Sequence, residues 1–155
     1  VGENLRYLVH DLQGRPLACL LFGAAAWKTA CRDRFIGWTE EQKKAGLPLI
    51  VNNTRFLILP WVKVPNLASH LLSLVAKRIG DDWVEKYARP VYLLETFVER
   101  DRFAGTCYQA ANWIKLGSTV GRSRNDQSRR LAVPIKDVYV YPLHRHFKKA
   151  LVYEF

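Results

Sequence analysis

The stretch Thr54–Trp83, TRFLILPWVKVPNLASHLLSLVAKRIGDDW, predicts a buried strand, a tight turn and a long amphipathic helix. Phe56–Leu59 is a short, unbroken apolar run, which is typical of a strand covered on both faces. Pro60 and Pro65 end regular pairing, because proline brings no N–H to a ladder. Asn66 then stands where a helix N-cap is expected.

The predicted helix is marked by aliphatic side chains that recur at helical spacing through Leu67–Ile79. It ends near Gly80 or continues through Trp83. A strand that enters a helix through a short turn presents unpaired N–H groups and the helix dipole to an anion. Any binding chemistry is therefore expected to begin at Lys63–His70, although most such junctions in α/β domains bind nothing.

The composition fits one domain over residues 1–155, with 49% hydrophobic residues to supply a core. No run of about 18 apolar residues is present, so we expect no membrane span. The formal net charge of +10 suits a phosphate-rich partner, which means DNA, RNA or a nucleotide-bearing cofactor. The chain begins at Val1 without methionine, and we expect it to be a fragment of a longer protein.

The three cysteines are scattered and include no C-x-x-C pair, which argues against a disulfide framework and a structural zinc site. This usage fits a reducing cytoplasm. Cys19 and Cys107 have apolar neighbours, which favours buried packing over reactivity.

Before the central stretch, the sequence predicts a hairpin with strands at Leu5–Val9 and Pro16–Phe22. Cys31–Trp38 is expected to be a charged loop. Thr39, with Gln42 three residues on, forms a capping-box pattern that opens a short helix. Asn52-Asn53 is more typical of a turn than of two side chains that face a site.

After the central helix the pattern alternates again. We expect a strand at Val91–Val98 interrupted by Glu95, a helix at Thr106–Trp113, a strand at Ile114–Arg122 bent at its glycines, a mobile basic loop at Arg122–Arg130, a last strand at Ile135–Leu143 and a basic tail at His144–Lys149. A carboxylate in a core strand faces solvent, pairs with a base or does chemistry, and an arginine partner is favoured here.

This order of elements resembles the acyltransferase fold of the GCN5-related N-acetyltransferase superfamily, without its first strand and first helices. The expected fold class is therefore α/β, a mixed central sheet flanked by helices. In that fold a bulged strand runs into a loop of pattern Q/R-x-x-G-x-G/A, whose N–H groups hold the pyrophosphate of acyl-coenzyme A. The corresponding window here is Lys63–Ala68, with Lys in place of Gln or Arg and Asn in place of the first Gly. Asn tolerates a left-handed backbone, whereas Pro65 removes one donor.

A second resemblance covers about residues 2–147. Five segments are similar to the Druantia anti-phage system protein DruA family: LLFGAAAWK, RDRFIGW, VNNTRFLILPWVKVPNLASHLLS, LLETFVERDRFAGTCYQAANWIKLGSTVGR and KDVYVYPL. Members of that family often lie beside or are fused to transposases. The resemblance carries over no catalytic residue.

The fold resemblance implies a set of acyl-transfer residues. Acetyl-CoA or another acyl-CoA would lie on Lys63, Asn66, Leu67, Ala68 and Ser69. Glu95 is the candidate base and Tyr108 the candidate acid. The alternative is that Tyr108 packs in the core and Glu95 pairs with Arg100 or Arg102.

Two basic clusters instead indicate binding to DNA or RNA, through phosphate contacts from a flexible loop and from the C-terminal tail. They comprise Arg122, Arg124, Arg129, Arg130, Arg145, Lys148 and Lys149. Trp38, Trp61 and Trp113 could stack on bases if they are exposed, and otherwise pack in the core. The alternative for the arginines is a solvated loop.

His144 and His146 follow the last strand, but no metal-ligand spacing is present and we expect no metal site. The sequence favours a DruA-like component of phage defence or of a mobile element that acts at nucleic acid, beside other defence or transposition proteins. An acyltransferase is the alternative.

Overall fold

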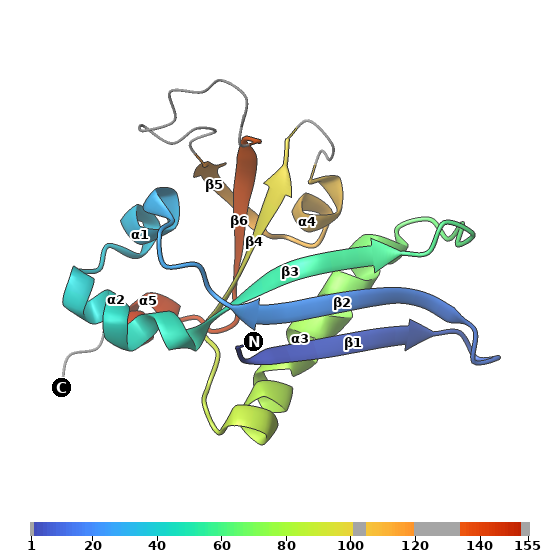
Figure 1. Ribbon diagram of the computed structural model, residues 1–155, viewed down its shortest axis with the longest axis horizontal. Coiled ribbons are helices and arrows are strands. Elements are labelled where there is room, and N and C mark those ends of the chain that lie inside the picture. Colours follow the sequence, from blue (N-terminus) through green and yellow to red (C-terminus); the bar gives the residue numbers. More distant parts are fainter. Residues whose placement is uncertain (1, 101–104, 120–133, 153–155) are drawn as a thin grey trace.

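The computed structural model describes residues 2–100, 105–119 and 134–152, which form a mixed six-stranded sheet in the order β1-β2-β3-β4-β6-β5 (Figure 1). Strands β3 and β4 are parallel, and the other neighbouring pairs are antiparallel. The elements are β1 (Asn4–His10), β2 (Pro16–Ala24), α1 (Ala30–Ile36), α2 (Glu40–Gly46), η1 (Leu47–Leu49), β3 (Ile50–Ile58), α3 (Leu67–Tyr87), β4 (Leu93–Glu99), α4 (Thr106–Ala110), β5 (Ile114–Ser118), β6 (Lys136–Pro142) and α5 (Phe147–Leu151).

Each face of the sheet has its own hydrophobic core. Helix α3 lies behind β1, β2 and β3 in Figure 1 and packs Leu72, Ile79 and Trp83 against one face. The other core gathers side chains from β3, β4 and β6 with α1 and α5, and Ile36 and Leu151 belong to it. The expected α/β fold with helices on both faces is therefore confirmed.

Helix α3 is the predicted long helix, and it extends beyond both expected ends. Gly80 lies in its interior, and the helix continues to Tyr87, where Ala88 closes it in a left-handed conformation. Asn66 is its N-cap and has φ 60°, the left-handed backbone that asparagine tolerates better than most residues. The short helix after Thr39 is confirmed too, with both hydrogen bonds of its capping box in place.

The expectation of a charged loop over Cys31–Trp38 is wrong. Residues Ala30–Ile36 form helix α1, which ends at Gly37 with φ 77°. The charged side chains of this segment suggested a solvated loop. Arg32, however, is fully buried and anchors the helix to the sheet.

The expectation of a turn at Asn52-Asn53 is also wrong, because both residues are buried inside the continuous strand β3. The pairing of β2 with β3 shifts between Leu21 and Phe22, so that Thr54 forms a β-bulge. The Asn53 amide nitrogen donates to the carbonyls of Leu21 and Arg55, both at 3.0 Å, and so satisfies acceptors that the bulge exposes.

Strands β3 and β4 pair only as far as Asn53 and Thr96, and then diverge (Figure 1). Beyond this point β3 leads to the N-terminus of α3, while β4 continues beside β6. The divergence opens between two strands of the same sheet, and both Asn residues of β3 lie at its closed end.

The remaining strands agree with their predicted positions to within a few residues. Gly117 sits at a shift in the pairing of β5 with β6, which confirms a bent strand there, whereas Gly121 lies outside the described residues. Cys107 packs against the core as expected, but Cys19 is only half-buried on β2. Among the described helices, none combines the length and the apolar character needed to cross a membrane.

Candidate functional site

Glu95 is fully buried on β4, at the closed end of the divergence. Its carboxylate accepts three hydrogen bonds. Arg32 Nη1 donates at 2.8 Å, the Asn52 amide at 3.0 Å and the backbone N–H of Ala26 at 3.2 Å. The expected arginine partner is therefore present, but it comes from α1 and not from the segment after β4.

Arg32 is equally enclosed, and all five of its N–H donors are used. Besides Glu95, the guanidinium donates to the carbonyls of Ala26 and Trp27 and twice to Asp33 Oδ1. The residues suggested as partners of Glu95 have other places. Arg100 pairs with Asp137 at 2.7 Å, and Arg102 lies outside the described residues.

This environment favours a structural role for Glu95. A general base needs a lone pair within reach of the proton that it takes. The Glu95 carboxylate is 0% exposed and its oxygens face three donors. The assignment of Glu95 as a base stays a prediction, and it requires Arg32 or Asn52 to move first.

Tyr108 lies on the opposite face of the sheet. Its hydroxyl donates to Asn53 Oδ1 at 2.6 Å, and the Thr96 hydroxyl donates to the Asn53 carbonyl at 2.9 Å. Thr96 follows Glu95 in β4, so the two side chains point to opposite faces. The structure thus does not bring Glu95 and Tyr108, the candidate base and acid, together.

Burial raises the pKa of the Tyr108 phenol above its ordinary value, although a hydrogen bond with Thr96 opposes the shift. The phenol therefore keeps its proton at neutral pH and presents it to Asn53. It could act as an acid only if a leaving group replaced Asn53 as its acceptor. Its ring stacks with Tyr139 and meets the edge of Trp113, as the packing alternative expected.

The predicted cofactor loop lies at the open end of the divergence. Lys63 and Asn66 are exposed, and Leu67, Ala68 and Ser69 are half-buried. Pro65 lacks an N–H, the Leu67 N–H contacts the Val64 carbonyl at 3.4 Å, and the Ser69 hydroxyl is bonded to the Asn66 carbonyl. The turn thus has the left-handed geometry of an anion-binding loop with fewer free donors than a glycine-rich loop offers.

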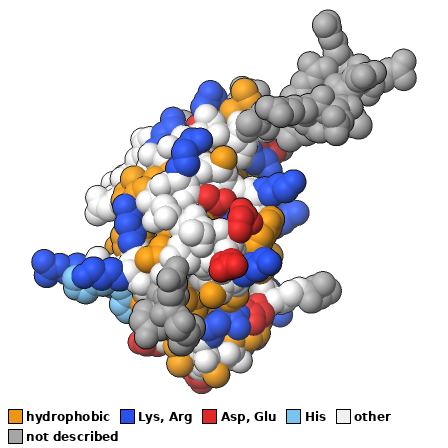
Figure 2. Space-filling view, turned by 90° about the vertical axis from the view of Figure 1, so that its left-hand side faces the viewer, with side chains coloured by type: hydrophobic (Ala, Val, Ile, Leu, Met, Phe, Trp, Pro, Cys, Tyr) orange, Lys and Arg blue, Asp and Glu red, His pale blue; other side chains and the backbone are white. Residues whose placement is uncertain are grey.

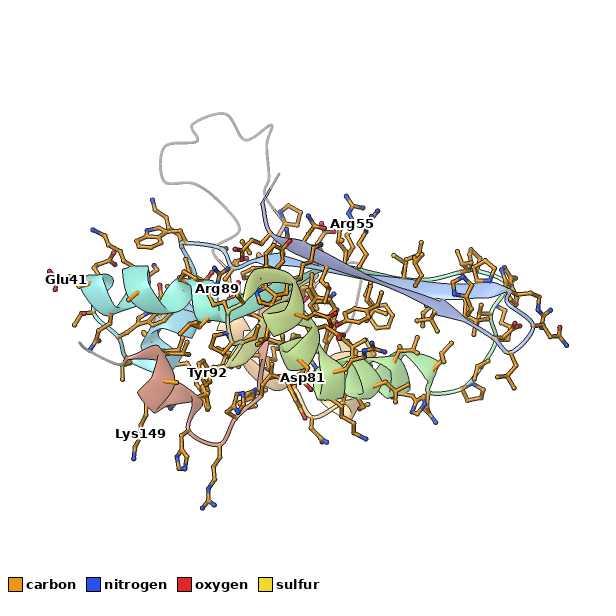
Figure 3. The ribbon with its side chains drawn as sticks, turned by 90° about the horizontal axis from the view of Figure 1, so that it is seen from below. Glu41, Arg55, Asp81, Arg89, Tyr92 and Lys149 are labelled. Carbon is orange, nitrogen blue, oxygen red and sulfur yellow. The ribbon has the colours of Figure 1, made fainter. Side chains whose placement is uncertain are left out.

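A second candidate site follows the far end of β6. A shallow hollow of about 560 Å³ is lined by Tyr92, His144, Arg145, His146, Lys149 and Ala150. We call it the basic hollow. Figure 2 shows lysine, arginine and histidine side chains projecting together at one margin of this end of the molecule, and Figure 3 shows Lys149 extending from α5 into solvent on the side of Tyr92.

The basic hollow combines positive charge with an aromatic floor. His144, Arg145, His146 and Lys149 are exposed, and the Tyr92 ring lies half-buried with its centroid 5.0 Å from that of His144. Within the described part of the chain, Arg145 and Lys149 form no ion pair with a carboxylate. Their charges are therefore available to an anionic ligand.

The structure places the predicted nucleic-acid residues unevenly. Arg145 and Lys149 come together in the basic hollow, whereas the Lys148 ammonium lies 4.5 Å from the Phe35 ring. The four loop arginines, Arg122, Arg124, Arg129 and Arg130, lie outside the described residues. Since that loop precedes β6 and the hollow follows it, the two basic regions attach to opposite ends of one strand.

The tryptophans mostly pack. Trp113 is 5% exposed, and Trp38 is half-buried with its indole N–H donating to Asp33. Trp61 is half exposed and lies under the Arg15 guanidinium. Over the described ranges, no three His, Cys, Asp or Glu side chains are placed to hold a metal ion.

Sequence reasoning missed Arg32, Asn52 and Asn53 because their partners lie far away in the chain. Arg32 and Glu95 are 63 residues apart, and Tyr108 and Asn53 are 55 apart. Adjacent asparagines after an apolar run were a usable signal, since alternation along a strand sends two such side chains to opposite faces. Tyr92 carried no signal beyond its place in a strand.

Solved N-acetyltransferases share this fold. The spermidine N-acetyltransferase from Vibrio cholerae in complex with CoA and spermine matches with a TM-score of 0.58 and 9% identity, over 90% of this chain and 66% of that one. A protein assigned as a phosphinothricin N-acetyltransferase matches with a TM-score of 0.57 and 11% identity, over 90% and 71%. At such identities the likeness shows the fold alone, and this chain spans about two thirds of the enzyme from Vibrio cholerae.

Comparison with curated proteins finds no match. The sequence profile described as Druantia protein DruA, in contrast, matches residues 1–135, which is most of the chain. The segments quoted from the sequence lie largely within that range. The chain belongs to the Druantia protein DruA family.

Proposed function

We propose that this DruA-family chain serves anti-phage defence by holding DNA or RNA at the basic hollow, on a scaffold with the N-acetyltransferase fold. The observation that carries the proposal is the convergence of Arg145 and Lys149, both exposed and without a carboxylate partner among the described residues, beside an aromatic pair. Lysine and arginine bind phosphates, and aromatic rings stack on bases without regard to sequence.

The charge of the whole chain supports the same partner. A formal net charge of +10 attracts a polyanion from any direction, so weak binding alone would say little about a site. The test must therefore ask whether particular cations matter more than others that carry the same charge. Lys148 offers this comparison because it neighbours Lys149 but lies outside the hollow.

The experiment measures the affinity of labelled duplex and single-stranded DNA and RNA by fluorescence anisotropy. We expect the double variant Arg145→Ala/Lys149→Ala to bind about tenfold or more weakly than the unaltered chain. The double variant Lys77→Ala/Lys148→Ala removes the same charge from exposed positions outside the hollow and should lose less. Equal losses in both would refute a site at the hollow.

A third variant separates the hollow from the arginine loop. Replacement of Arg122, Arg124, Arg129 and Arg130 by alanine tests the loop contribution. If only this variant loses affinity, then nucleic acid binds the loop and the hollow is not the site. If both regions contribute, the losses should add, since they attach to opposite ends of β6.

Acyl-CoA binding is the second candidate function. Its specific support is the divergence of β3 from β4, which ends at a left-handed turn before α3. One structural neighbour was solved with CoA. Acetyl-CoA would contact Lys63, Asn66, Leu67, Ala68 and Ser69, with Tyr108 as acid. The base would be Glu95 only if its ion pair with Arg32 opened.

Calorimetric titration with acetyl-CoA tests this candidate. Micromolar binding that survives Asn66→Gly but is lost in Asn66→Ala would place the ligand at the turn, because glycine accepts the left-handed backbone and alanine strains it. The absence of heat with the unaltered chain would remove acyl-CoA as a ligand. Partner proteins from defence or transposition systems remain part of the proposal for the whole protein.

A further inference from the structure

The β1–β3 half of the sheet is covered on one side only. Helix α3 packs on one face, and Figure 1 shows β1, β2 and β3 in front of it with no described helix on the near side. Figure 3 shows Arg55 pointing away from α3, on that open side. We call this surface the outer face. Its side chains are Arg6, Leu8, Cys19, Leu21, Arg55 and Leu57.

The register arranges these side chains in two cross-strand rows. Leu8 pairs with Cys19, and Cys19 with Leu57, which makes an apolar row across all three strands. Leu8 is 68% exposed and Leu57 is 55% exposed. Contiguous apolar surface of this kind is rare on isolated domains and marks sites of protein association.

The next row has the order Arg6, Leu21, Arg55. Two strand spacings separate the arginines, which amounts to about 10 Å and equals the width of an α-helix. Neither arginine forms an ion pair within the described ranges. A helix laid along β2 would cover Cys19 and Leu21 and carry a flank toward each guanidinium.

We propose that the outer face docks an amphipathic α-helix of a partner protein, with an apolar stripe flanked on both sides by carboxylates. The apolar row would bury the stripe, and Arg6 and Arg55 would pair with the two flanks. A second copy of this chain fits poorly, because a two-fold contact through this face sets cations against cations.

The probes are two labelled helical peptides of about 18 residues with the same leucine stripe, one flanked by glutamate and one by lysine. We expect the chain to bind the glutamate peptide and not the lysine peptide in anisotropy titrations. The variant Arg6→Glu/Arg55→Glu should lose at least about tenfold in affinity for the glutamate peptide and gain affinity for the lysine peptide. The variant Arg34→Glu/Arg78→Glu changes the same charge elsewhere and should preserve the preference.

Three results would overturn the proposal. The first is no binding of either peptide, or equal binding of both. The second is a dimer of the chain alone in sedimentation that Leu57→Glu disrupts, which assigns the face to a second copy. The third is binding by residues 1–155 that a longer form of the same polypeptide lacks, which assigns it to that polypeptide. Circular dichroism of each variant confirms that the exposed substitutions leave the fold intact.

Discussion

Arg32 ties three parts of the molecule together through one side chain. It is 0% exposed, and its five hydrogen bonds join α1, the Ala26-Trp27 segment and β4. Burying two charges is costly, and the cost is offset only while both partners stay bonded. The pair therefore fixes geometry more than it adds stability.

Removing Arg32 should be strongly destabilising. Arg32→Met leaves the Glu95 carboxylate buried without its cation, and we expect a loss of about 3–5 kcal/mol in the free energy of unfolding, measured in urea. Arg34 lies on the same helix but is exposed, so Arg34→Met should change this free energy by less than about 0.5 kcal/mol. Equal effects of the two substitutions would contradict a buried network centred on Arg32.

Asp33 connects this network to α2 and should make stability depend on pH. Burial raises the pKa of Asp33, but hydrogen bonds from Lys43 and Trp38 and the charge of Arg32 outweigh it, so the pKa lies below its ordinary value. A carboxyl group of this kind stabilises the fold above its unfolded pKa of about 3.9, and the contribution disappears as pH falls through the lower folded value.

The corresponding experiment compares Asp33→Asn with the unaltered chain in urea at several pH values. The unaltered chain should be more stable by a constant margin from pH 7 to about pH 5, and the margin should shrink below about pH 4. A margin that stays the same at every pH would show that the ionisation of Asp33 is not involved.

Long-range contacts decided which site residues the sequence could reveal. An arginine partner for Glu95 followed from the cost of a lone buried carboxylate, but its identity depended on a contact 63 residues away. Tyr108 was found through a family resemblance, and its acceptor Asn53 was not. Local patterns thus indicated the chemistry required, and only the fold supplied the partner.

The helices show the same division between local and distant causes. Thr39 and Gln42 predicted α2 because the capping box is a contact between near neighbours. Helix α1 was missed because its stability depends on Arg32 reaching the sheet. Helix α3 was found from its periodicity, and its extension past Gly80 shows that one glycine does not end a helix packed on a core.

Two glycines at helical positions should respond oppositely to alanine. A Cβ on Gly46, at the end of α2, would press on the Leu151 carbonyl of α5 and on the Trp38 ring, so Gly46→Ala should lose about 1–3 kcal/mol of unfolding free energy. A Cβ on Gly80, inside α3, meets nothing within 4 Å, so Gly80→Ala should gain about 0.5–1 kcal/mol. Thermal unfolding measures both, and a stabilising Gly46→Ala would contradict the packing of α2 on α5.

The molecule as a whole carries three surfaces on one scaffold. The divergence of β3 and β4 is the feature shared with acyltransferases, but its candidate acid and base lie on opposite faces of the sheet. The basic hollow and the outer face lie away from that divergence and follow from charge and exposure. The fold and the family were predictable from the sequence, because element order and long word-like strings are both sequence properties. The hollow was not, since Tyr92 reaches it from the start of β4 and Lys149 from α5.

The slope of nucleic-acid affinity against salt concentration tests the central claim most directly, because it counts the phosphate contacts that are lost. For duplex DNA, a plot of log K against log salt should flatten by about two contacts in Arg145→Ala/Lys149→Ala. The slope should stay unchanged in Arg6→Ala/Arg55→Ala, which removes two cations from the outer face. This result would place phosphates at the basic hollow. An unchanged slope in Arg145→Ala/Lys149→Ala would show that nucleic acid, if it binds, binds elsewhere.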